Sequence, residues 1–199
     1  MKTPLPTTTI SHDEIVAIIT KFYTFLTTYP FLPATAIKTP PSEGWPEEYC
    51  DIWRKMGKSE EVVDLLARLP YIDDDNWVWY HDTMPINYTK PLNLRRIKEH
   101  YEEKRYVFEP SGVALPPHVF SLTHGKLYGK WVLLDIKART ITELGVLGGV
   151  QPAEATEEAK VGGDAWSMYP TRPIKEFFDA CQDKMSGKSL VASRNYIRC

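Results

Sequence analysis

The stretch HVFSLTHGKLYGKWVLLD, residues 118–135, decides the fold class. Residues 118–124 place Phe120 and Leu122 on one side and Val119 on the other, the alternation that is typical of a β-strand. The segment GKLYG at 125–129 supplies the glycines of a turn. The continuous apolar run at 130–135 is typical of a strand that is covered on both faces. We therefore expect a hairpin whose second strand lies in the centre of a sheet.

Two further segments resemble strands. The sequence TITELGV follows the hairpin, and WVWY at 77–80 alternates, with Trp77 and Trp79 on one face of the expected strand. Between and around these segments, apolar residues recur at helical spacing. Helices are expected behind a capping box at 11–14, at 47–56, after Ser59, at 92–105 and from near Pro173. This order predicts an α+β fold with N-terminal helices, a central and mostly antiparallel sheet, and a C-terminal helix packed on the sheet.

The length of 199 residues fits one domain that spans residues 1–199. Five prolines between residues 29 and 46 preclude regular structure and predict an extended segment on the surface. Residues 148–164 are rich in glycine, alanine and glutamate, and we expect a mobile surface loop there.

Composition and charge exclude several classes of partner. Apolar residues make up 43% and charged residues 25%, which is ordinary usage for a soluble protein. A formal net charge of −2 gives no general attraction to nucleic acid or to an anionic membrane. The chain has no run of about 18 apolar residues, so no membrane-spanning segment is expected. Three cysteines without a CxxC pair are typical of a reducing compartment, and we expect a cytoplasmic protein.

Motifs that carry chemistry are missing from the sequence. The five histidines form no HExxH or HxH spacing, and His118 and His124 lie at opposite ends of one expected strand, about 20 Å apart. There is no nucleophile elbow and no glycine-rich phosphate loop. Cys50 lies between Tyr49 and Trp53, the setting of a small core residue. We expect no catalytic residue, no metal site and no cofactor.

An acidic and aromatic stretch, YIDDDNWVWYHD at 71–82, is the main candidate for a binding surface. The contiguous acids lack the alternate spacing of a calcium loop and favour a turn that leads into a strand. Tryptophans rimmed by carboxylates would also suit docking of a basic protein partner. The candidate patch consists of Asp73, Asp74, Asp75, Trp77, Trp79, His81 and Asp82.

Four blocks of the sequence resemble a set of fungal proteins. They are GWP at 44–46, GKSEEVVDLLARLPYI at 57–72, LPPHVFSLTHG…YGKWVLLD at 115–135 and YPTRPIKEFF at 169–178. That set is in turn similar to the SUKH superfamily, which includes a fungal regulator of cell-wall synthesis and bacterial toxin-immunity proteins. The resemblance implies an α+β domain that binds proteins and does not catalyse a reaction.

Three functions of different classes follow from these observations. The first is a regulatory or immunity-like protein-interaction domain that acts through the candidate patch. The second is a small-molecule binder or enzyme of a fungal metabolic pathway. Its pocket would be lined by tryptophans such as Trp131 and gated by the loop at 148–164, with His81, His118 or Asp135 as polar groups. The third is a homo-oligomeric scaffold that uses a sheet edge or Cys199; otherwise we expect a monomer or a weak homodimer.

Overall fold

The computed structural model describes residues 10–75, 77–79, 82–101, 108–110, 115–125, 128–145, 166 and 169–187. The expected α+β fold, with its C-terminal helix, is confirmed. The helices are α1 (His12–Leu26), the 3₁₀ turn η1 (Ala34–Ala36), α2 (Glu47–Lys55), α3 (Glu60–Arg68), α4 (Pro91–Tyr101) and α6 (Ile174–Met185). The strands are β1 (Ile37–Lys38), β2 (Tyr71–Ile72), β3 (Thr83–Pro85), β4 (Val119–Ser121), β5 (Thr123–Gly125), β6 (Lys130–Asp135), β7 (Thr140–Gly145) and β8 (Thr171–Pro173).

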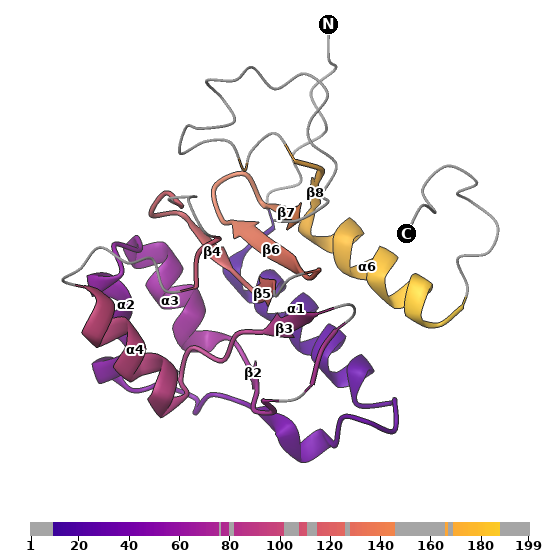
Figure 1. Cartoon of the computed structure of the whole chain (residues 1–199), viewed down its shortest axis with the longest axis horizontal. Helices are drawn as coiled ribbons and strands as arrows, with labels where there is room; N and C mark the ends of the chain where they lie inside the picture. The colour runs from indigo at the N-terminus through magenta and orange to yellow at the C-terminus, as the bar shows by residue number, and fades with distance from the viewer. Residues whose placement is uncertain are drawn as a thin grey trace, which may run out of the picture.

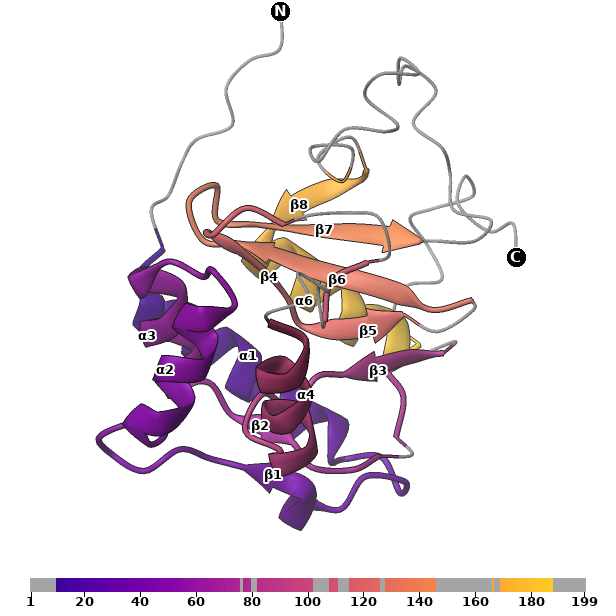
Figure 2. The same ribbon diagram turned by 60° about the vertical axis from the view of Figure 1, so that its left-hand side comes forward.

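The largest sheet is antiparallel throughout and has the strand order β4-β6-β7-β8. Strand β6 lies between β4 and β7, and its four central residues are buried, as the apolar run at 130–135 predicts. Figure 2 shows β8, β7, β6, β5 and β3 stacked one below another.

The alternation in residues 118–124 predicted one uninterrupted strand, but the structure has two short strands there, β4 and β5. The ladder breaks at Leu122, so that β4 pairs with β6 while β5 pairs with β3. The Thr123 hydroxyl takes the place of backbone groups at the break: it donates to the Lys130 carbonyl at 2.8 Å and accepts from the Val132 amide at 2.9 Å. Two threonine hydroxyls therefore join the sheets, because Lys130 N also donates to Thr83 Oγ1 at 2.9 Å.

Helices α1 and α6 contribute the aromatic centre of the core. The capping box at the start of α1 is present as predicted, and the buried face of this helix includes Ile15, Ile19 and Phe22. Helix α6 packs against β7, β8 and α1, and the rings of Phe22 and Phe178 lie 5.0 Å apart. In Figure 1, α6 lies on the side of the sheet away from α2, α3 and α4.

Helices α2, α3 and α4 lie together as a second group, and α2 and α4 enclose a smaller cluster of Ile52, Leu94 and Ile97. Their bounds agree with the helices expected at 47–56 and after Ser59. The helix expected at 92–105 begins at Pro91, and residues 102–107 lie outside the described part of the chain. Among the described helices, none is long and apolar enough to cross a membrane.

Three expectations need correction or fall outside the structure. Residues 77–79 do not form the strand that WVWY predicted, since the Trp79 ring turns into the core. The proline-rich segment 29–46 includes η1 and the two-residue strand β1, which its prolines did not predict. The loop expected at 148–164 lies outside the described residues.

Candidate functional site

An open depression of about 540 Å³ lies beside the acidic turn. Strand β1, the chain after β2 and the turn that leads into α4 meet there. The lining residues are Ile37, Lys38, Thr39, Trp45, Asp73, Asn87, Thr89, Lys90 and Pro91. They combine an indole ring, charges of both signs and several uncharged polar groups, which is the composition of a recognition site.

The pairing of β1 with β2 places Lys38 and Asp73 on the same depression. Lys38 pairs with Tyr71, and the Asp73 amide continues the pairing by donating to the Ala36 carbonyl at 2.8 Å. This register holds the first residue of the acidic turn beside β1. Residues 73–75 belong to no helix or strand, which agrees with the turn interpretation.

Trp45 is held in the wall of the depression by two hydrogen bonds. Its backbone amide donates to the Ala67 carbonyl at 2.8 Å, and its indole Nε1 donates to the Leu69 carbonyl at 2.9 Å. The preceding Gly44 has a φ of 91°, and a Cβ there would lie 3.1 Å from the Ala67 oxygen. Glycine is therefore required for the close approach that positions the indole.

Asn87 contributes a buried amide to the depression. The residue is 6% exposed, and its Oδ1 accepts from the Thr89 amide at 2.9 Å and from the Thr89 hydroxyl at 2.7 Å. Its backbone carbonyl accepts from Asn93 Nδ2 at 2.7 Å. Within the described part of the chain, Asn87 Nδ2 has no hydrogen-bond acceptor, which leaves its N–H groups for a ligand.

Lys90 links the acidic turn to the depression. Its Nζ forms an ion pair with Asp75 Oδ1 and lies 3.8 Å from Asp73 Oδ1. The Lys90 side chain is 23% exposed, whereas that of Asp75 is 75% exposed. One face of the Asp75 carboxylate is thus still open to solvent and to a partner.

The structure does not assemble the acidic–aromatic patch as the sequence predicted it. Trp79 is 5% exposed, and its ring packs against Phe22 at 5.1 Å and also against Tyr23 and Phe178. Trp77 is partly buried against the same core. Asp82 is partly exposed and has a φ of 55°, and His81 lies outside the described residues. The structure thus withdraws Trp79 from the candidate patch, while Asp73, Asp74 and Asp75 keep exposed or partly exposed positions in the acidic turn.

The alternative pocket residues fall into two separate places. His118 Nε2 lies 3.8 Å from Asp135 Oδ2, and Asp135 Oδ1 is held by the amides of Lys137 and Ala138 at 2.8 and 2.9 Å. Trp131 lies near the other end of β6, is 5% exposed and packs against the His124 ring at 4.7 Å. The structure therefore pairs His118 with Asp135 but does not bring Trp131 to them.

The thiols of two cysteines are held in their neutral form. Cys50 is buried, as its aromatic neighbours predicted, and burial is the main cause that raises its pKa. Burial also raises the pKa of Cys181 on α6 to about 12. Neither thiol has the lowered pKa of a nucleophile.

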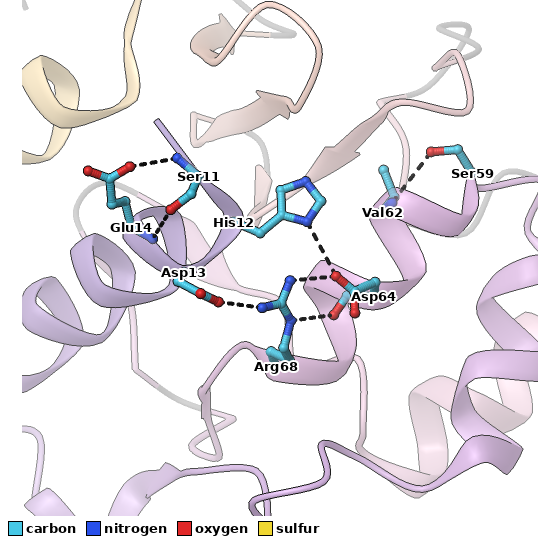
Figure 3. A network of polar contacts seen from close by, with 8 residues as sticks. All are labelled: Ser11, His12, Asp13, Glu14, Ser59, Val62, Asp64 and Arg68. Atoms are coloured by element: carbon cyan, nitrogen blue, oxygen red, sulfur yellow. Dashed lines mark hydrogen bonds and ion pairs between the residues drawn. The ribbon is translucent and has the colours of Figure 1, made fainter. Parts of the chain in front are cut away.

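A second polar cluster joins α1 to α3 (Figure 3). His12 Nδ1 lies 3.3 Å from Asp64 Oδ2, and Arg68 forms ion pairs with Asp64 and, at 2.5 Å, with Asp13. The spacing of Asp64 and Arg68 on one helix could have predicted their pair, but no local signal marks the contacts between helices. The Asp13 side chain is 86% exposed, so this cluster is an open contact between two helices.

Comparisons of the chain with protein-family models, curated proteins and solved structures found no match. Among the described residues, no group of three or more His, Cys, Asp and Glu side chains is placed to hold a metal ion. The geometry of the depression and its rim is therefore the basis for a functional proposal.

Proposed function

We propose that this chain is a non-catalytic domain that binds another protein through the acidic turn and the adjacent depression. The observation that carries the proposal is the convergence on one depression of an indole wall, a buried amide with unused N–H groups and charges of both signs. In line with the family resemblance, the proposal includes a regulatory or immunity-like role in the cytoplasm.

The charges at the rim favour a partner segment that carries lysine or arginine. The Asp75 side chain is mostly exposed although it forms an ion pair with Lys90, so its carboxylate can also contact a partner. An exposed ion pair contributes about 0.2–1 kcal/mol, so the acidic turn selects a partner and speeds its association without providing most of the affinity. Contact with Trp45 and Ile37 provides apolar burial in the same depression.

Selection from a displayed peptide library tests this function. We expect the wild-type chain to enrich peptides with a basic residue beside an apolar one. Replacing both Asp73 and Asp75 by Asn is expected to weaken the binding of the enriched peptides, by up to about fivefold in affinity for each lost ion pair. The matched control is Glu48→Gln with Glu61→Gln, which removes the same charge from exposed positions on α2 and α3. Equal weakening by both double variants would show that only net charge acts, and would remove the acidic turn from the site.

A second candidate function, small-molecule binding or acid–base catalysis, is favoured by the contact between His118 and Asp135. The carboxylate is fixed by two backbone amides and lies 3.8 Å from His118 Nε2, close enough for an ion pair but beyond hydrogen-bond distance. Mass spectrometry of metabolites retained by the wild-type chain and by His118→Gln tests this function. A metabolite retained by the wild type and lost by the variant would favour it over protein binding.

A further inference from the structure

The amino end of α4 opens at the depression. The helix begins at Pro91, which lines the depression and has no N–H, and the first helical hydrogen bond runs from Leu94 N to the Lys90 carbonyl. The backbone N–H groups of Leu92 and Asn93 have no acceptor among the described residues, and the first turn contains no acidic residue. These N–H groups, together with the helix dipole, favour an anion at this end of the helix.

Asn87 provides independent evidence for a ligand at this position. The backbone N–H of Thr89 can only donate, so the atom that it contacts must be the Asn87 oxygen. Nδ2 is then the end of this 6% exposed lining residue that has no acceptor among the described residues. A ligand oxygen in the depression could accept a hydrogen bond from this amide group.

Two lysines lie around the same space. Lys38 is exposed and forms no ion pair with any residue that the structure describes, whereas Lys90 is paired with Asp73 and Asp75. Because the Asp73 carboxylate lines the depression, a doubly charged anion would be repelled. A single negative charge, balanced by Lys38, suits the site better.

We propose that the depression binds a carboxylate, and that this carboxylate is the C-terminus of the bound protein. The assignment of the carboxylate to a protein C-terminus rests on the proposed function. Capture of a chain end by free backbone N–H groups and a cation is a known mode of peptide recognition. The carboxylate lies between Asn87 Nδ2, Lys38 and the start of α4. The last side chain contacts Trp45 and Ile37, and a preceding basic residue reaches Asp75.

The test compares two peptides that differ only at the chain end, acetyl-Lys-Lys-Gly-Leu as the free acid and as the C-terminal amide. Binding is followed by ¹H–¹⁵N correlation NMR spectra of the full chain. The free acid is expected to shift the side-chain NH₂ signals of Asn87 and the backbone signals of Leu92 and Asn93. It is also expected to bind about tenfold more tightly than the amide, the effect of one charge-assisted hydrogen bond.

Two variants check that the effect arises at this site. Lys38→Gln changes an exposed side chain and is expected to remove most of the preference for the free acid. Asn87→Asp retains the Oδ1 acceptor that Thr89 requires and places a negative charge where the ligand oxygen would lie, so it is expected to remove binding of the free acid. A preserved spectrum outside the depression identifies variants that are folded.

The outcomes separate this inference from the function on which it rests. Equal affinity for the free acid and the amide, with weaker binding when Asp73 and Asp75 are replaced by Asn, overturns the carboxylate site and leaves the protein-binding function intact. A preference for the free acid that does not depend on these aspartates supports the carboxylate site and removes the acidic turn from the function. Acetyl-leucine or acetate that binds as tightly as the peptide overturns the chain end as the occupant.

Discussion

Lys58 and Glu109 form an ion pair that is almost completely withdrawn from solvent. Lys58 Nζ donates to Glu109 Oε1 at 2.8 Å and to the Val119 carbonyl at 3.0 Å, and the two side chains are 2% and 5% exposed. Glu109 Oε2 accepts from the Leu115 amide at 3.2 Å. The ion pair thus connects the chain immediately before α3 to the chain that precedes β4.

Removing one partner of this ion pair is expected to destabilise the fold strongly. Lys58→Met leaves the Glu109 carboxylate buried without a counter-ion, and such a change costs about 3–5 kcal/mol. The double variant Lys58→Met with Glu109→Leu leaves no buried charge and is expected to cost less than Lys58→Met alone. Urea unfolding of the single and double variants measures the difference. Additive losses would mean that the two side chains act independently.

The Thr123 hydroxyl is expected to be needed where the sheet ladder breaks. Thr123→Val keeps the β-branched shape but leaves the Lys130 carbonyl and the Val132 amide without their partner. We expect a loss of about 2–4 kcal/mol in the free energy of unfolding.

The control for this prediction is Thr140→Val on β7, for which we expect a change of less than about 0.5 kcal/mol. Its hydroxyl makes no hydrogen bond with any residue that the structure describes. Urea unfolding measures both variants, and a similar small change in both would contradict the role of Thr123.

The stability of the chain is expected to fall at alkaline pH. Burial raises the pKa of the hydroxyls of Tyr23, Tyr71 and Tyr88, with the Glu109 carboxylate as a second cause for Tyr88. The folded state therefore holds protons that the unfolded state loses above pH about 10. Each buried hydroxyl reduces the free energy of unfolding by about 1.4 kcal/mol per pH unit above that point.

Tyr23→Phe tests the alkaline prediction. The substitution removes no hydrogen bond between the Tyr23 hydroxyl and a described residue. Between pH about 10 and about 12, the free energy of unfolding is expected to fall less steeply with pH, because the variant has one buried hydroxyl fewer. Tyr128→Phe is the control, because its ring is 70% exposed. Urea unfolding at several pH values compares the three chains, and equal slopes in all of them would contradict the prediction.

Local signals in the sequence predicted most of the fold. The capping box at Ser11, the serine cap before α3 and the apolar run of β6 each depend on a few adjacent residues, and the structure has all three. The segment at 77–79 shows the limit of such signals. Its alternation is typical of a strand, but the Trp79 ring packs against Phe22 on α1 and Phe178 on α6, and these helices are distant in the sequence.

The candidate site was predicted only at its rim. The acidic turn stood out because its charges are contiguous in the sequence. The depression beside it depends on which residues face each other when β1 pairs with β2 and when the turn at Asn87 leads into α4. Asn87 carries a local signal, since asparagine two residues before Thr89 predicts a side-chain turn. Nothing local places Lys38 or Trp45 opposite that turn.

The contact between α1 and α6 has a consequence for synthesis of the protein on the ribosome. Phe22 on α1 is covered in part by Phe178 on α6, and the Tyr29 hydroxyl donates to the Met185 carbonyl at 2.8 Å. At a translation rate of about 5–20 residues per second, the first helix waits roughly 8–30 s for this cover. During that interval its apolar face is a substrate for chaperones, and a nascent chain that stops before α6 would present the same face to proteases.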